Sequence, residues 1–252
     1  DLVGRAKSTE QREGAPAKPK ADAAPERFRY RLSFAKEGAL RWVGHLDLQA
    51  TFSRTLRRAK LPQWFSKGFH PRPKLVFASA LPLGCSGGEE LMDLWLREEL
   101  PGEQVLERLR NAAPPGLRFS SAELIALRGP AVTTLIESAL YRVKLPEELD
   151  DAGLAALGER LEALLAAETL PRQRRGKDYD LRPLIVSVEL VDRELELELL
   201  AQKGKNGRIE EVLDALALDP AACRSHREGL KLFAPEDKEP QASETAPSEN
   251  SA

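Results

Sequence analysis

The segment RFRYRLSF, residues 27–34, alternates polar and apolar side chains without a break. A period of two is typical of a β-strand with one buried face. The four apolar residues of the segment would face a core, and its three arginines would lie on the opposite face of the sheet. This segment therefore predicts both the first strand of a sheet and a positively charged surface on that sheet.

Positive charge is concentrated around this segment. Residues 27–74 contain twelve lysines and arginines against two acids, Glu37 and Asp47, whereas the whole chain has a formal net charge of -2. A concentrated positive field on a nearly neutral protein indicates a polyanionic partner, and nucleic acid is the commonest one.

Hydrophobic patterns further along the chain predict two similar sets of elements. The first set adds a helix over 45–60, strands over 73–81 and 90–97, a helix over 101–112 and a strand over 117–126. The second set has a strand over 140–145, a helix over 151–168, strands over 184–191 and 194–201, a helix over 208–217 and a strand over 228–233. Both follow the ferredoxin-like order βαββαβ. We expect an α+β protein with two tandem ferredoxin-like (βαββαβ) units, at 27–130 and 131–233.

The composition of the remaining chain narrows the class of protein. Residues 1–26 are rich in Ala, Pro, Lys and Glu, and residues 234–252 in Pro, Ser and Glu, which predicts a disordered linker and a disordered acidic tail. No apolar run is long enough for a membrane span, and no signal peptide is evident, so we expect a cytoplasmic protein. The two cysteines and three histidines are too few and too scattered for a disulfide framework or a metal site.

The arginine face of the first strand is a candidate binding surface. In a ferredoxin-like sheet the first and third strands are neighbours, so Trp95 would lie beside Arg29 and Arg31 on the face without helices. Such arginines can hold phosphates while a base stacks on the indole. Alternatively, this face packs against the second unit, with Trp95 in the interface.

The second unit differs in charge on the equivalent strands. Its first strand exposes Arg142 and Lys144, and glutamates at 194, 196 and 198 on its third strand can form cross-strand ion pairs with them. In the first unit only Asp93 is available for this role. We therefore expect nucleic-acid contact mainly on the first unit.

Each unit also has a basic loop between its first helix and second strand: KGFHPRPK, residues 67–74, and RQRRGK, residues 172–177. The prolines of the first loop favour an extended backbone, which would align every second side chain. Two such loops at one topological position predict a shared role in RNA binding. The expected RNA-binding residues are Arg29, Arg31, Arg54, Arg58, Lys67, His70, Arg72, Lys74, Trp95, Arg174, Arg175 and Lys177.

Catalysis within the chain has weaker support. His45 begins the first predicted helix close to Asp47, and a histidine there, or His70, could act as a general base in metal-independent RNA cleavage. A histidine at a helix start is more often a capping or packing residue. We therefore expect no catalytic activity of the chain's own and keep His45 and His70 as candidates.

Four short motifs occur in order: RWVGHLDL at 41–48, FSKGFHPRPK at 65–74, ALPLG at 80–84 and DLRP at 180–183. Together they resemble the radical SAM-linked family, over most of residues 27–233. That family commonly has Ser at the position of Gly44, and Ser is a better helix cap than Gly. The resemblance implies a radical SAM protein as partner, fused or separate, which would supply an iron–sulfur cluster, S-adenosylmethionine and, in B12-binding partners, cobalamin. It implies no cofactor in this chain.

Three functions follow as hypotheses. The chain is an RNA-binding accessory module that presents a transfer or ribosomal RNA to the radical SAM enzyme, a metal-independent endoribonuclease like those that process CRISPR repeats, or a docking scaffold for the radical SAM partner. The first depends on basic side chains from both units converging into one open groove.

Overall fold

The computed structural model describes residues 27–67 and 69–234. The predicted linker at 1–26 and nearly all of the predicted acidic tail lie outside these residues. The strands are β1 (Phe28–Lys36), β2 (Leu75–Phe77), β3 (Ser86–Leu96), β4 (Leu117–Ile125), β5 (Ile136–Lys144), β6 (Pro171–Arg174), β7 (Lys177–Asp180), β8 (Ile185–Val191), β9 (Glu194–Gln202), β10 (Lys205–Asn206) and β11 (Arg224–Leu232). The α-helices are α1 (His45–Arg58), α2 (Gly102–Ala112), α3 (Asp151–Ala166) and α4 (Ile209–Ala215), and the 3-10 helices are η1 (Gly38–Trp42), η2 (Val132–Thr134) and η3 (Arg182–Leu184).

Strand β1 forms where the alternating segment predicts it. Tyr30, Leu32 and Phe34 are buried in one apolar core together with side chains of α1 and α2. The strand lies between β3 and β4 and is antiparallel to both. Its register with β3 places Arg29 opposite Trp95 and Arg31 opposite Asp93, so the predicted proximity of the first and third strands is confirmed.

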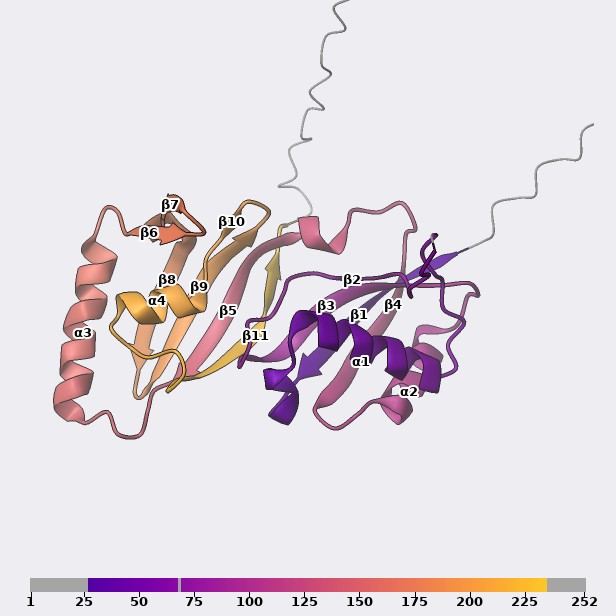
Figure 1. Ribbon diagram of the computed structural model, residues 1–252, viewed down its shortest axis with the longest axis horizontal. Coiled ribbons are helices and arrows are strands. Elements are labelled where there is room, and N and C mark those ends of the chain that lie inside the picture. Colours follow the sequence, from indigo (N-terminus) through magenta and orange to yellow (C-terminus); the bar gives the residue numbers. More distant parts are fainter. Residues whose placement is uncertain (1–26, 68, 235–252) are drawn as a thin grey trace, which may run out of the picture.

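One large, mostly antiparallel sheet runs through the molecule (Figure 1). The strand order is β10-β9-β5-β11-β3-β1-β4, with β2 also on β3 and β8 also on β9. Within each half the strands have the same arrangement, namely β4-β1-β3-β2 in the first and β11-β5-β9-β8 in the second. The halves join where β11 pairs with β3 in parallel. They share one sheet, which the repeated element pattern alone did not predict.

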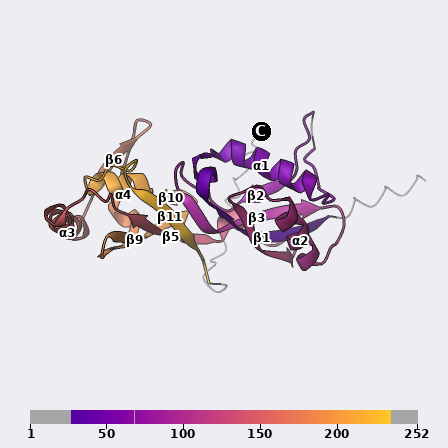
Figure 2. The same ribbon diagram turned by 90° about the horizontal axis from the view of Figure 1, so that it is seen from below.

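The helices gather on one side of this sheet. Helices α1 and α2 lie over the first half and α4 over the second, while α3 lies at the far end beside β8 (Figures 1 and 2). Beneath them are two main apolar cores, one in each half. No helix in the described part of the chain is both long enough and apolar enough to cross a membrane.

Some strands differ from their predicted lengths because of tertiary contacts. β3 begins at Ser86 rather than near Glu90, and β11 begins at Arg224 rather than near Glu228. The added residues of the two strands pair with each other, His226 with Ser86 and Arg227 with Gly87. β2 is reduced to three residues because the segment before it folds back on itself as a hairpin.

A buried ion pair lies at the junction of the halves. Arg227 is 1% exposed, and its guanidinium donates to both carboxylate oxygens of Glu90, which is 3% exposed. The buried Lys36 lies nearby and donates to the carbonyl oxygen of Val43 at 2.9 Å, which fixes the end of η1. Burial lowers the pKa of Lys36.

Candidate nucleic-acid interface

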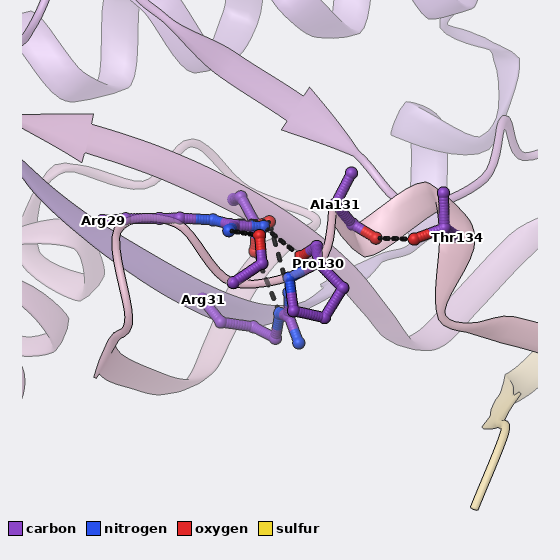
Figure 3. A network of polar contacts seen from close by, with 7 residues as sticks. Arg29, Arg31, Pro130, Ala131 and Thr134 are labelled. Carbon is purple, nitrogen blue, oxygen red and sulfur yellow. Dashed lines mark hydrogen bonds and ion pairs between the residues drawn. The ribbon is translucent and has the colours of Figure 1, made fainter. Parts of the chain in front are cut away.

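The arginines of β1 are engaged inside the protein (Figure 3). Arg29 is 3% exposed, and its guanidinium donates to Asp93 on β3 and to the carbonyl oxygens of Gly129, at 2.7 Å, and Pro130, at 2.6 Å. Arg31 donates to the same carboxylate at 2.9 Å, and its side chain is 19% exposed. One aspartate thus pairs with both arginines, and the segment after β4 covers Arg29.

Trp95 is enclosed with these arginines. The residue is 8% exposed, and its ring contacts two cations: the Arg29 guanidinium carbon lies 5.3 Å from the ring centroid and the Lys74 ammonium nitrogen 4.5 Å. Burial, and then the positive charges of Arg27 and Arg29, lower the pKa of Lys74. These cation–π contacts occupy the indole face that a base would need.

The expectation of an open arginine face on β1 is therefore wrong. Arg29 and Trp95 are not accessible to a phosphate or a base, and Arg31 and Lys74 are largely committed to contacts within the protein. The physical reason is the carboxylate on the neighbouring strand. A guanidinium group that pairs with a carboxylate loses its water at a much lower free-energy cost than an unpaired guanidinium group.

The first basic loop folds into a hairpin, described over residues 62–67 and 69–74, which we call the first basic hairpin. The backbone N–H of Ser66 donates to the carbonyl oxygen of Arg72 at 2.8 Å, and that of Lys74 donates to Trp64 at 2.7 Å. Phe65 forms an isolated β-bridge with Pro73. The N–H of Arg72 also donates to the Ser66 hydroxyl at 3.1 Å. These bonds give the loop a defined shape without a ligand.

The tip of the first basic hairpin presents an aromatic ring among cations. Phe69 is 102% exposed, so none of its apolar surface is buried against the rest of the protein. Lys67, His70 and Arg72 around it are exposed as well. Sequence reasoning singled out these basic residues but missed Phe69, although its position between glycine and histidine in a polar loop was an available signal.

The second basic loop also forms a hairpin, made of β6 and β7, which we call the second basic hairpin. Arg175 and Gly176 form its turn, both with positive φ, at 49° and 74°. Arg175 and Lys177 are exposed and Arg174 is half-buried. Asp180 anchors the base, because its carboxylate accepts from the backbone N–H of Leu170 at 2.7 Å and of Arg182 at 3.0 Å.

The two basic hairpins rise from the helix-covered side of the sheet but at opposite ends of the long axis (Figure 2). They therefore do not close around one groove, and the expectation of a single convergent channel is wrong. Helix α1 lies between them and exposes Arg54, Arg57 and Arg58 on the same side. The accessible positive charge therefore lies on two separate hairpins, with the exposed arginines of α1 between them.

The second half balances the charge of its sheet with two of the three predicted glutamates, whereas Glu198 pairs with Lys231 instead. Arg142 lies 3.5 Å from Glu194 and 3.3 Å from Glu196, and Lys144 lies 3.4 Å from Glu194. These pairs are exposed and cross adjacent strands, β5 and β9. The basic residues of β5 are therefore neutralised, and the basic hairpin is the cationic feature of this half.

The histidine candidates lack the surroundings of a catalytic base. His45 is exposed at the start of α1, where its ring lies 3.0 Å from the Gln49 amide nitrogen and packs edge-on against Phe77. His70 is exposed on the first basic hairpin. Neither forms an ion pair with a carboxylate in the described residues, and no group of three potential metal ligands occurs there.

Two of the short sequence motifs meet at the junction of the halves. The N–H of Gly84 donates to the carbonyl oxygen of Arg41 at 2.9 Å, and the Trp42 ring packs directly on Gly84, where an added Cβ would lie 2.8 Å from the ring. Trp42 is nevertheless 60% exposed. These motifs shape the junction, and the other two form the first basic hairpin and the base of the second.

Comparison with known proteins places the chain in a family. No curated protein matches it. Among solved structures, an unknown protein from Galdieria sulphuraria is similar at 15% identity, covering 83% of this chain and 100% of its own, with a TM-score of 0.27, which supports no argument about fold or function. The family model DUF2344, described as an uncharacterized protein conserved in bacteria, matches residues 29–210. The chain therefore belongs to this family.

Proposed function

We propose that the protein is an RNA-binding accessory module, built from two ferredoxin-like units, that holds a structured RNA with its two basic hairpins. The observation that carries the proposal is Phe69, fully exposed at the tip of a hydrogen-bonded hairpin and flanked by Lys67 and Arg72. An aromatic ring offers a stacking surface to any unpaired base, and adjacent cations hold the phosphates.

The separation of the two hairpins favours a folded RNA over a single strand in a channel. Two cationic projections on one side of a protein can contact separate backbone segments of one helical RNA, as shape-reading RNA-binding domains do. Exposed arginines of α1 lie between the projections. A transfer or ribosomal RNA provides both helical backbone and unpaired loop bases.

The motif resemblance supplies the proposed partner. A module that binds RNA without changing it would act by presenting the RNA to an enzyme, and the radical SAM-linked motifs favour a radical SAM enzyme in this role. The cofactors of that chemistry would then belong to the partner.

The test is RNA binding by the purified full chain, measured by fluorescence anisotropy with a labelled transfer RNA at several salt concentrations. Phe69→Ala should weaken binding by about 1–3 kcal/mol if the ring stacks on a base. Lys67→Gln combined with Arg72→Gln should also reduce the salt dependence, by about 0.7–0.9 in slope for each lost phosphate contact.

Matched controls separate a specific site from general charge. Leu124→Ala removes another exposed apolar side chain, 45% exposed on β4, and Arg128→Gln removes another exposed cation. Both should leave RNA affinity unchanged. Absence of RNA binding even at low salt, or equal losses in the controls and the hairpin variants, would overturn the proposal.

A further inference from the structure

A cleft of about 490 Å³ lies beneath the second basic hairpin. Its walls come from three elements: Arg174 and Tyr179 from the hairpin, Asn206 from β10, and Arg208 and Glu211 at the start of α4. This volume lies within the range of small-molecule sites. Sequence reasoning selected Arg174 but missed Arg208 and Tyr179, which lie far apart in the chain.

The two arginines of the cleft form no close ion pair with a carboxylate among the described residues. Ion pairs in the second half use Arg142, Lys144 and Lys231. Neither Arg174 nor Arg208 takes part in any of the ion pairs found among the described residues. Burial, and then repulsion from Arg174, lower the pKa of Arg208; Glu210 opposes this shift, and Arg175 adds to the repulsion. An anion between the guanidinium groups would relieve this repulsion.

A polar atom in the wall also lacks a partner. The hydroxyl oxygen of Tyr179 is buried and makes no hydrogen bond in the structure. A buried hydroxyl without a partner destabilises the protein, so such groups usually have a hydrogen-bond partner. An oxygen atom of a ligand in the cleft would accept a hydrogen bond from the Tyr179 hydroxyl.

The acids of the cleft do not prevent anion binding. Asp180 is occupied, since its carboxylate accepts two backbone N–H groups at the base of the hairpin. Glu211 forms no ion pair within 4.0 Å among the described residues; burial raises its pKa, and the nearby Arg174 and Arg172 oppose that rise. Glu211 nevertheless sets a limit on affinity that a neutral residue would remove.

We propose that this cleft binds the phosphate group of a nucleotide between Arg174 and Arg208, with the Tyr179 hydroxyl donating to a phosphate oxygen. Guanidinium groups match the geometry of phosphate oxygens and bind them with two parallel hydrogen bonds. The phosphate belongs either to the backbone of a bound RNA or to a free nucleotide. The first source rests on the proposed function, and the second does not.

The test uses the full chain and isothermal titration calorimetry with uridine 5′-monophosphate, and with uridine as the probe without phosphate. The monophosphate should bind and uridine should not. Arg208→Gln should weaken the affinity at least ten-fold, Tyr179→Phe should weaken it several-fold, and Glu211→Gln should strengthen it. Arg224→Gln removes an exposed cation of the same half that does not line the cleft, and it should leave the affinity unchanged.

Several outcomes would overturn the site: equal binding of uridine, no effect of both Arg208→Gln and Tyr179→Phe in proteins with unchanged circular dichroism, or an equal loss in Arg224→Gln. The affinity of the Arg208→Gln variant for transfer RNA identifies the source of the phosphate. A parallel loss supports the cleft as a backbone-phosphate site, and an unchanged RNA affinity supports a free nucleotide. Phe69→Ala should not alter monophosphate binding, so this test remains separate from that of RNA binding.

Discussion

At the scale of single residues, Asp93 decides where positive charge is available. It is fully buried and lies between Arg29 and Arg31, so the two arginines of β1 contribute to the interior rather than to the surface. The cations at the tips of the hairpins are exposed and form no ion pair among the described residues, namely Lys67, Arg72, Arg175 and Lys177. The distribution of a few carboxylates, rather than the number of arginines, therefore selects the candidate interface.

Replacing Asp93 with Asn should strongly destabilise the protein. The change leaves the Arg29 charge buried without a counter-ion, and such losses cost about 3–5 kcal/mol of unfolding free energy. Urea denaturation measures the effect. Glu37→Gln removes the exposed pair with Arg118, whose side chain is 68% exposed, and should cost far less. Similar losses for the two variants would contradict the role given to Asp93.

Because of Cys85, the stability of the protein should fall as the pH rises through the alkaline range. Burial raises the pKa of its thiol to about 12, whereas in the unfolded chain the thiol has its ordinary pKa of about 9.0. Above the unfolded pKa the unfolded chain loses the proton and the folded protein keeps it. The thiol therefore lowers the unfolding free energy by up to about 1.4 kcal/mol per pH unit between these values.

The measurement compares wild-type protein with Cys85→Ala in urea at pH 8, 9 and 10. The stability of the wild-type protein should fall more steeply with pH, so that the difference between the two proteins changes across this interval. Parallel curves would show that the thiol titrates alike in the folded and unfolded states.

At the scale of elements, the turns before α1 and before β4 support each other. The N–H of Glu37, before η1, donates to the carbonyl oxygen of Gly116 at 2.8 Å. Gly116 has a φ of 84°, and an added Cβ would lie 2.5 Å from the Glu37 carbonyl oxygen. Gly38 also has a positive φ, 57°, but space surrounds it. The two glycines thus differ in crowding and share a left-handed backbone.

Gly38→Ala should therefore cost only the left-handed backbone strain, about 1–2 kcal/mol. Gly116→Ala should cost clearly more, because the new methyl group collides with backbone that cannot move without loss of the hydrogen bond. Thermal unfolding followed by circular dichroism compares the two. An equal decrease in both variants would show that the contact at Gly116 adds nothing.

Local patterns predicted most elements, since the apolar periodicity of β1, α1, α2, β5 and β9 directly reflects the side chains that these elements bury. The pairing of β11 with β3 could not be predicted, because it joins residues about 140 positions apart and depends on how two separate patterns meet. The burial of Trp95 depends on the segment that covers it, near Gly129 and Pro130. For the site, sequence composition identified the basic loops but not the cleft, whose residues converge only after folding.

At the scale of the whole molecule, the two halves form one structural unit. The sheet is continuous through β3 and β11, and the buried Arg227 on β11 reaches Glu90 on β3. Arg227 also lies near the Tyr141 hydroxyl, at 3.5 Å, so it connects strands from both halves. This arrangement indicates that the halves unfold together.

The prediction is a single cooperative transition. All three tryptophans lie in the first half, so their fluorescence reports on it alone, whereas circular dichroism reports on both halves. The two signals should coincide in urea. Arg227→Ala leaves the Glu90 charge buried, at a cost of about 3–5 kcal/mol, and should separate the curves. Separate transitions in the wild-type protein would contradict this view of the junction.

The position of β11 in the sheet has a consequence for synthesis on the ribosome. The other large strands are complete before it emerges, yet it is β11 that fills the space between β5 and β3. Until then, both of those strands expose unpaired backbone groups, and such edges promote aggregation of nascent chains. We expect the growing polypeptide to need protection by chaperones until β11 inserts, and truncation before Arg224 to yield insoluble product.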